Sequence, residues 1–403
     1  MDLLSLPIAV FCGVVCCRLT LKELVRLDAA FCCQQRENWI QLLRSFQFSF
    51  DAPVEISGNY KMGWLLNRNV TVSDVKFVRE LNRTDVSGIS KYLRTYGSSV
   101  RSVHFNGGDQ VEINLVAIFC RALTRLCITA ASLTSEFSNV LHCNPNIQHL
   151  VVENVRCKEP NLMEGLSFHT LQSLCMVGVV AGDYKGCLWH ESTHGNCIHT
   201  VIWDNCVFRE KDFRALLTNC PQLRSFSCNG CPLGELCLLD NYVHLMTRLI
   251  NFSASDDDSL TDATLLTLAR NLTSLRTLNI RGCNFLTDQS LLHIAEHSRT
   301  TLEVLYADIK NPESKETGQV LETFSQKCTK LTLLNVNCRD KLLCTGRGTS
   351  MLVRGCPALR TLVVNRRETI CESSREFIAV MRPKLTLLVH DNSTVYDILS
   401  MPI

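Results

Sequence analysis

Two short motifs contain residues whose types and spacing could carry out chemistry. The first is an H-E-x-x-H string from His190 to His194, in which two histidines can bind zinc and a glutamate can act as a general base. That chemistry requires both histidines on one face of a helix, whereas the glycines on both sides of the motif favour a loop. A zinc hydrolase centred on His190 and His194 is therefore only a minor alternative, and we expect no metal and no cofactor.

The second motif is the C-x-x-C pair Cys228 and Cys231, a spacing typical of redox-active pairs and of zinc sites. Both cysteines also occupy regular positions of a repeat that runs along the chain, so a role as small buried side chains accounts for them. The sequence contains no phosphate-binding loop, no dinucleotide-binding motif and no nucleophile elbow. We therefore predict no catalytic residue and a protein that is not an enzyme.

Length and composition narrow the class of protein. A chain of 403 residues exceeds one compact core, which predicts either two domains or a repeat architecture. The net charge of +2 gives no reason to expect nucleic acid or a membrane as partner. The 23 cysteines would indicate disulfides in a secreted protein, but Asp2 and Pro7 argue against a secretion signal at the start. We expect the cytoplasm or the nucleus, with an extracellular protein as the alternative.

A string of the form L-x-x-L-x-L recurs along most of the chain at intervals of 23 to 29 residues. In the copy at Leu275, Leu278 and Ile280 alternate with polar residues, as in a strand with one buried face. Asp288 then follows as a candidate helix N-cap, as does Asp262 in the preceding copy. Each unit is thus strand, turn and helix, and stacked units bury a continuous core. The copies begin at Val100, Leu123, Ile147, Leu171, Ile198, Leu223, Leu249, Leu275, Leu302, Leu331, Leu359 and Leu385, with a weaker one at Val72.

The cysteines follow the same period. Cys206, Cys231 and Cys283 each lie eight residues after the first apolar residue of their repeats. This pattern resembles the cysteine-containing subclass of leucine-rich repeats, over roughly residues 72 to 395. The resemblance implies an α/β solenoid, a curved horseshoe with parallel strands on the concave face and helices on the convex face.

Polar residues recur at the strand positions that would face the concave side. They form either a solvated face or a partner-binding surface, because this architecture normally presents its binding residues there. The candidates for a protein-binding surface are Asp204, Asn229, Asn279, Arg281, Tyr306, Asp308, Asn335, Asn337 and Asn365.

Residues 1 to about 50 do not fit the repeat and predict three short helices. Thr20 and Glu23 have the spacing of a capping box at the start of the second helix. The segment resembles an F-box in its opening Leu-Pro, its leucine-rich second helix and its tryptophan after a cysteine-rich bend. That resemblance implies docking on the Skp adaptor of a cullin ubiquitin ligase. The residues that would contribute to docking or to the module's core are Leu6, Pro7, Val10, Leu24, Leu27 and Trp39.

The predicted organisation has three parts: an F-box-like helical module at residues 1–50, a linker with a degenerate first repeat at residues 51–98, and a solenoid of about twelve repeats at residues 99–403. The predicted function is the substrate-recognition subunit of an SCF-type ligase, in which the repeats hold a protein substrate that the sequence does not identify. The alternative is a non-catalytic interaction scaffold whose N-terminal helices only cap the solenoid.

Overall fold

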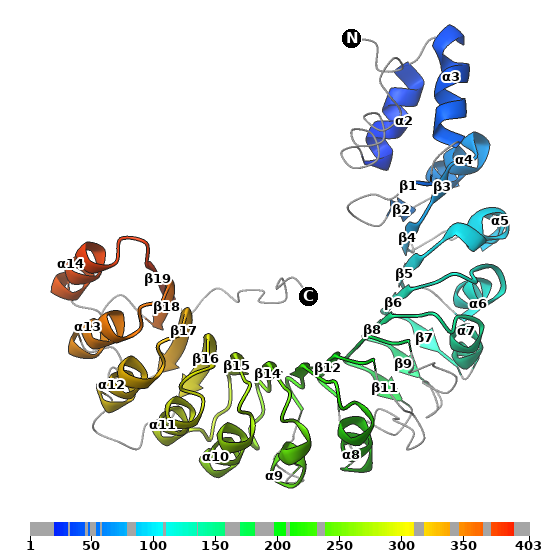
Figure 1. The fold of residues 1–403 in the computed structure, drawn as a ribbon. Coiled ribbons are helices and arrows are strands. Elements are labelled where there is room, and N and C mark those ends of the chain that lie inside the picture. The colour runs from blue at the N-terminus through cyan, green and yellow to red at the C-terminus, as the bar shows by residue number, and fades with distance from the viewer. Residues whose placement is uncertain are drawn as a thin grey trace. The chain divides into compact units, whose positions relative to one another are not determined.

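The fold divides into two compact units, Met1–Ile198 and His199–Ile403, which are described separately. The computed structural model describes residues 20–30, 33–44, 47–48, 54–56, 59–78, 86–107, 110–134, 136–157, 170–181, 197–206, 210–231, 238–309, 318–338, 346–365 and 372–390. In each unit the helices that alternate with the strands lie on one side of the strand layer (Figure 1). None of the helices in these segments is long and apolar enough to cross a membrane.

The N-terminal unit is a parallel strand ladder preceded by two helices, α2 (Leu21–Ala30) and α3 (Cys33–Arg44). Its strands pair in chain order: β2 (Val54–Ile56), β4 (Asp74–Val78), β5 (Ser102–Asn106), β6 (Arg125–Thr129), β8 (His149–Glu153) and β10 (Ser173–Val177). The helices that alternate with these strands are α4 (Asn59–Arg68), α5 (Val86–Tyr96), α6 (Gln110–Phe119) and α7 (Phe137–Cys143). Two smaller sheets join β1 (Gln47–Phe48) with β3 (Thr71–Val72), and β7 (Ser132–Leu133) with β9 (Arg156–Cys157) and β11 (Val180–Ala181).

The C-terminal unit repeats the same strand and helix alternation. Its strands are β12 (Thr200–Asp204), β13 (Ser225–Ser227), β14 (Asn251–Ser253), β15 (Thr277–Ile280), β16 (Val304–Ile309), β17 (Leu333–Cys338), β18 (Thr361–Asn365) and β19 (Thr386–His390), each parallel to the next. Its helices are α8 (Glu210–Asn219), α9 (Leu238–Tyr242), α10 (Asp262–Asn271), α11 (Asp288–His297), α12 (Gly318–Lys327), α13 (Gly346–Gly355) and α14 (Glu372–Met381).

Every copy of the repeat found in the sequence carries a strand, and the predicted α/β leucine-rich-repeat solenoid is confirmed. Two details differ. Thr386 pairs with Thr361, so the last copy begins at Lys384 and not at Leu385. In addition, β2 pairs with β4 and so extends the ladder into the segment that was predicted to hold a linker and a degenerate first repeat.

The repeat at Leu275 shows how one unit buries its apolar side. Leu278 is 3% exposed, and Ile280, Cys283 and Leu286 are fully buried. The same arrangement recurs in the neighbouring repeats, so stacking produces the continuous core that a single unit cannot form.

The helix caps correct the sequence prediction. The N-caps of α10 and α11 are Thr261 and Thr287, whose hydroxyls accept backbone N–H groups, and not Asp262 and Asp288. The Asp262 carboxylate instead accepts the backbone N–H of Thr287 at 2.9 Å, together with the Thr287 and Ser290 hydroxyls. An aspartate in one repeat therefore binds the N-cap residue of the next repeat's helix, which ties the two repeats together.

The backbone turns through a left-handed conformation shortly after each of eight strands. Asparagine, aspartate and glycine tolerate this conformation, whereas Ala130, with φ of 54°, adopts it at a cost of about 1–2 kcal/mol. At Gly282 a Cβ atom would also collide with the Asp256 side chain. The turn therefore recurs after the ladder strands from β5 to β15, at Gly107, Ala130, Asn154, Gly178, Asn205, Gly230, Asp256 and Gly282.

Candidate functional site

The helix α2 begins where the sequence predicts the second helix of the N-terminal segment. The Thr20 backbone N–H donates to Glu23 Oε2 at 2.8 Å, and the Glu23 N–H donates back to Thr20 Oγ1 at 3.4 Å, which confirms the capping box. These hydrogen bonds from Thr20 lower the pKa of the Glu23 carboxyl. Leu24 and Trp39 are fully buried, whereas Leu27 is partly exposed. The other three proposed docking residues lie outside the described residues: Leu6, Pro7 and Val10.

A buried carboxylate, Asp28, joins these helices to the first repeat. Its Oδ1 accepts the indole N–H of Trp39 from α3 at 3.1 Å. Its Oδ2 accepts the indole N–H of Trp64 and the Nε–H of Arg68, both from α4, at 3.0 Å. The α2 helix is therefore held to both α3 and α4 through one side chain, so the module is packed onto the start of the ladder.

The strand side of the C-terminal unit carries a chain of hydrogen bonds between repeats, which we call the strand-face network: Asp204, Ser227, Asn229, Ser253 and Asn279. Asp204 accepts the Ser227 hydroxyl at 2.7 Å and the backbone and side-chain N–H groups of Asn229 at 2.9 and 3.1 Å. Asn229 Oδ1 accepts the Ser253 hydroxyl at 2.6 Å, and Ser253 Oγ accepts Asn279 Nδ2 at 2.9 Å. Polar groups that looked available for a partner thus bind one another.

The remaining candidates on this face are partly withdrawn from solvent. Tyr306 and Asn335 are 8% and 7% exposed, and burial raises the pKa of the Tyr306 phenol. The backbone N–H of Arg281 donates to Asn279 Oδ1 at 3.3 Å. The side chains of three further candidates on β16, β17 and β18 lie outside the described residues: Asp308, Asn337 and Asn365.

The cysteines at the turn position pack as neutral side chains. The Cys231 thiol donates to the Trp203 carbonyl at 2.9 Å, and the Cys283 thiol donates to the Ala254 carbonyl at 3.2 Å. Burial raises the pKa of each of these two thiols to about 12, and raises the pKa of Cys228 as well. A reactive cysteine needs the opposite shift, so this C-x-x-C pair is poorly suited to redox chemistry.

The zinc-protease motif can be located only in the sequence, because His190 and His194 lie outside the described residues. Within the part of the chain that the structure describes, no three His, Cys, Asp or Glu side chains gather as metal ligands.

The residues that lead into the strands form a second surface, which the sequence analysis did not single out. We call it the strand-start edge, and its exposed cations are Arg224, Arg276, Arg360 and Lys384. The backbone N–H groups of the three arginines donate at 2.7–2.9 Å to the carbonyls of the residues directly before the preceding strands, which are His199, Ile250 and Thr332. The three arginines thus occupy the same position before β13, β15 and β18, while Ile250, Glu303 and Thr332 occupy it before β14, β16 and β17. The available signal was the Leu-Arg pair in three copies of the repeat.

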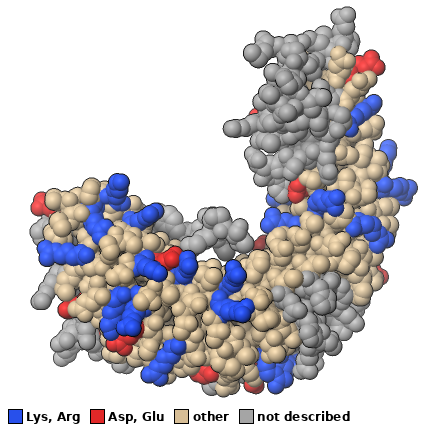
Figure 2. Space-filling model, in the orientation of Figure 1, with Lys and Arg blue, Asp and Glu red and all other residues tan. Residues whose placement is uncertain are grey.

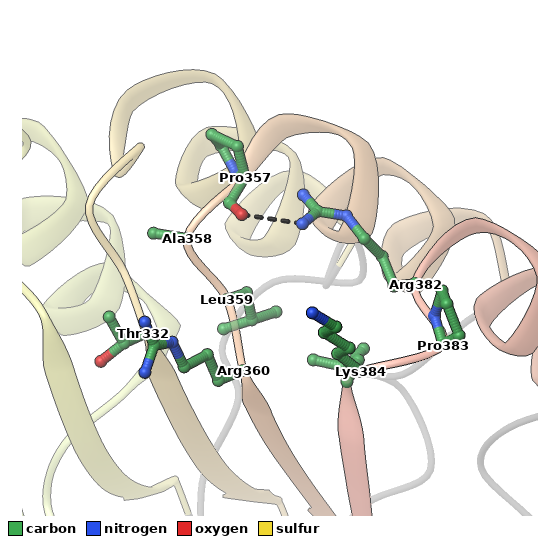
Figure 3. A pocket seen from close by; sticks show the side chains of 9 residues that line it. Thr332, Pro357, Ala358, Leu359, Arg360, Arg382, Pro383 and Lys384 are labelled. Atoms are coloured by element: carbon green, nitrogen blue, oxygen red, sulfur yellow. Dashed lines mark hydrogen bonds between the residues drawn. The ribbon is translucent and has the colours of Figure 1, made fainter.

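The strand-start edge ends in a pocket of about 660 Å³ at the beginning of β18 and β19. Figure 3 shows the side chains of Arg360, Arg382 and Lys384 around it. Figure 2 shows several Lys and Arg side chains on the last repeats of the C-terminal unit, with few acidic ones. The pocket is lined by Thr332, Pro357, Ala358, Leu359, Arg360, Arg382, Pro383, Lys384 and Leu385.

No protein-family model matches the chain, and no curated protein matches it in sequence. Among solved structures, it is similar to TLR13 in the TLR13–ssRNA13 complex, at 12% identity and a TM-score of 0.51 over 87% of this chain and 55% of TLR13. An internalin of Listeria monocytogenes is similar at 15% identity over 84% of this chain and 86% of its own, with a TM-score of 0.45. A chain of the yeast Rad7–Elc1 complex is similar at 15% identity over 92% of this chain and 88% of its own, with a TM-score of 0.42. At these identities the likeness is one of fold alone, that of a leucine-rich-repeat solenoid.

Proposed function

We propose that this chain is the substrate-recognition subunit of an SCF-type cullin ubiquitin ligase. In this proposal the repeats hold a protein substrate, the N-terminal helices dock on the Skp adaptor, and the chain itself is not an enzyme. It would act in the cytoplasm or the nucleus, where the free cysteines of the described repeats would remain reduced.

The observation that carries the proposal is a helical module packed in front of a leucine-rich-repeat solenoid. Solenoids present extended surfaces to protein partners, which supports the binding half of the proposal. The adaptor half depends on the F-box-like order of Leu6-Pro7, Leu24, Leu27 and Trp39. Of the described members, only Leu27 retains exposed surface for a partner, since Leu24 and Trp39 are fully buried.

One observation favours the alternative, in which the helices only cap the solenoid. Asp28 binds Trp64 and Arg68 of α4, so the module covers the end of the ladder whether or not it binds an adaptor. A terminal repeat needs such a cover in any solenoid. In that case the chain is an interaction scaffold without a ligase role.

The two alternatives differ in adaptor binding. We expect the full-length protein to capture purified Skp adaptor at micromolar concentration, and the double substitution Leu6→Ala with Pro7→Ala to weaken capture about tenfold or more, by loss of buried apolar contacts. Leu27→Ala should also weaken it, because this side chain lies between the buried and exposed faces of α2.

The control is Arg26→Ala on the exposed side of the same helix, which should leave capture unchanged. The thermal transition of the repeats should be nearly unchanged in all three variants. If the wild-type protein does not capture the adaptor, the ligase role is wrong and the scaffold takes its place. Deleting residues 1–50 is less informative, because the deletion also removes Asp28 from its partners on α4.

A further inference from the structure

The pocket at the start of β18 and β19 combines cations with an apolar wall. Arg360, Arg382 and Lys384 line it, and no acidic residue is among its lining residues. The described segments 318–338, 346–365 and 372–390 contain eight lysines and arginines and three glutamates, and none of these glutamates lines the pocket. Two prolines, an alanine, two leucines and Thr332 complete the lining, and such largely apolar walls strengthen the attraction of an anion.

The three cations have different roles. Arg382 is already engaged: its guanidinium donates to the carbonyls of Pro357 at 2.7 Å, Cys356 at 3.2 Å and Val353 at 3.3 Å (Figure 3 shows the first). These bonds satisfy carbonyls at and just beyond the end of α13 and fix one wall of the pocket.

Arg360 and Lys384 are different, because both are exposed and neither side chain binds an acid or another acceptor in the described part of the chain. They are therefore the two charges that a ligand can use.

The lining of the pocket indicates what kind of anion fits. A single phosphate could bind the cations but would leave the apolar wall uncovered. No aromatic side chain lines it, although single-stranded nucleic acid is typically bound by stacking on aromatic rings. A carboxylate next to an apolar side chain matches both the cations and the apolar wall.

The other cations of the strand-start edge lie farther along the ladder. Arg224 and Arg276 directly precede β13 and β15, which are two strands apart in the ladder, or about 10 Å at the usual strand spacing. Arg276 is paired with Glu303 at 3.3 Å, whereas Arg224 makes no ion pair within the described residues. Between Arg360 and Arg224 this edge carries Thr332 and the Arg276–Glu303 ion pair, so the unpaired cations next to the pocket are Arg360 and Lys384.

We propose that this pocket binds an acidic, extended segment of the protein partner, with Arg360 and Lys384 holding its carboxylates. This inference rests on the protein-binding half of the proposed function and not on the adaptor. It adds a substrate class: segments rich in aspartate and glutamate with interspersed apolar residues.

The test uses the full chain and a fluorescein-labelled peptide of alternating glutamate and leucine. At about 50 mM salt, where exposed charges are weakly screened, anisotropy should show binding that falls as salt is added. Arg360→Glu with Lys384→Glu should weaken binding about tenfold or more. The matched control is Lys211→Glu with Arg270→Glu on α8 and α10, which changes the net charge equally. Its affinity for the peptide should stay within about twofold of wild type. A peptide with glutamine in place of glutamate should not bind.

Several outcomes would overturn the inference. Equal losses in both double variants would mean that only net charge matters. Complete displacement by about 10 mM inorganic phosphate, beyond the effect of sodium chloride at equal ionic strength, would assign a small-anion site. Tighter, pocket-dependent binding of a single-stranded oligonucleotide would assign a nucleic-acid site. Adaptor capture by the pocket variant should equal that of wild type, so a failed ligase role and a failed peptide site give separate results.

Discussion

Two neighbouring surfaces of the C-terminal unit carry polar side chains in the same repeats but use them differently. On β12 to β15, Asp204, Asn229 and Asn279 belong to the strand-face network, in which each side chain binds a polar group of an adjacent repeat. At the strand-start edge, Arg360 and Lys384 extend into solvent without an acidic partner in the described part of the chain. Both surfaces look equally polar in the sequence. They differ because the side chains of the strand-face network have polar partners in the adjacent repeat, whereas Arg360 and Lys384 have none in the described residues.

Asn229 shows why this difference matters for function. Its side chain donates to Asp204 of the preceding repeat, and its oxygen accepts from Ser253 and Ser255 of the following one. A partner that used this amide would first have to displace these bonds, which offsets much of what it would gain. A polar row on a repeat protein is therefore a stronger binding candidate when its members have no partners at the repeat spacing.

Both surfaces depend on the same strand register. Replacing a buried leucine of β15 should cost the most stability and tests that register. Leu278 is 3% exposed on the core side of β15, so Leu278→Ala should lower the free energy of unfolding by about 2–5 kcal/mol. Thr277 is on the opposite side of the strand, and Thr277→Ala should change it by less than about 0.5 kcal/mol. Urea unfolding of the two variants measures both values. Similar losses would mean that the strand sides are wrongly assigned.

Replacing Asp204 should cause a smaller loss of stability, and it tests the strand-face network. Asp204 is 7% exposed and accepts three hydrogen bonds from Ser227 and Asn229. Asp204→Ala would leave these donors without their acceptor and should cost about 2–3 kcal/mol in unfolding free energy. Asp204→Asn keeps one acceptor oxygen but turns an amide donor towards the Asn229 donors, so it should recover only part of the loss. A cost below about 0.5 kcal/mol for Asp204→Ala would show that this face is free for a partner after all.

Much of the fold could be predicted from the sequence, because the strand positions depend on a local pattern. All the predicted strands are present, and only the last copy is displaced, since Leu385 and Leu388 imitate the spacing that pairing with β18 assigns to Lys384 and Leu387. The β2 strand was missed because Val54 and Ile56 follow a proline without the usual leading leucine. The helix N-caps were assigned to the aspartates and not to the threonines before them, because both residue types cap well.

The binding surface was harder to predict than the fold. The polar positions on β12 to β15 were found correctly, but their hydrogen bonds join residues 23 to 26 positions apart. Those bonds become visible only when the register of neighbouring strands is known. Arg360 and Lys384 were passed over for a related reason: their cooperation depends on a pocket formed by two successive repeats, which no local pattern encodes.

Replacing Arg360 and Lys384 should have the smallest effect on stability of the substitutions considered. Arg360 and Lys384 are exposed and make no hydrogen bond or ion pair within the described segments, so replacing both with alanine removes no stabilising contact. The free energy of unfolding should stay within about 0.5 kcal/mol of wild type. Because the change also relieves repulsion around Arg382, any shift should be a small gain that disappears as salt is raised. Urea unfolding at low and at high salt measures this.

A loss of 2 kcal/mol or more, about as large as expected for Asp204→Ala, would mean that these cations hold the fold together. The strand-start edge would then be structural like the strand-face network, and its charges would no longer be free for an acidic partner.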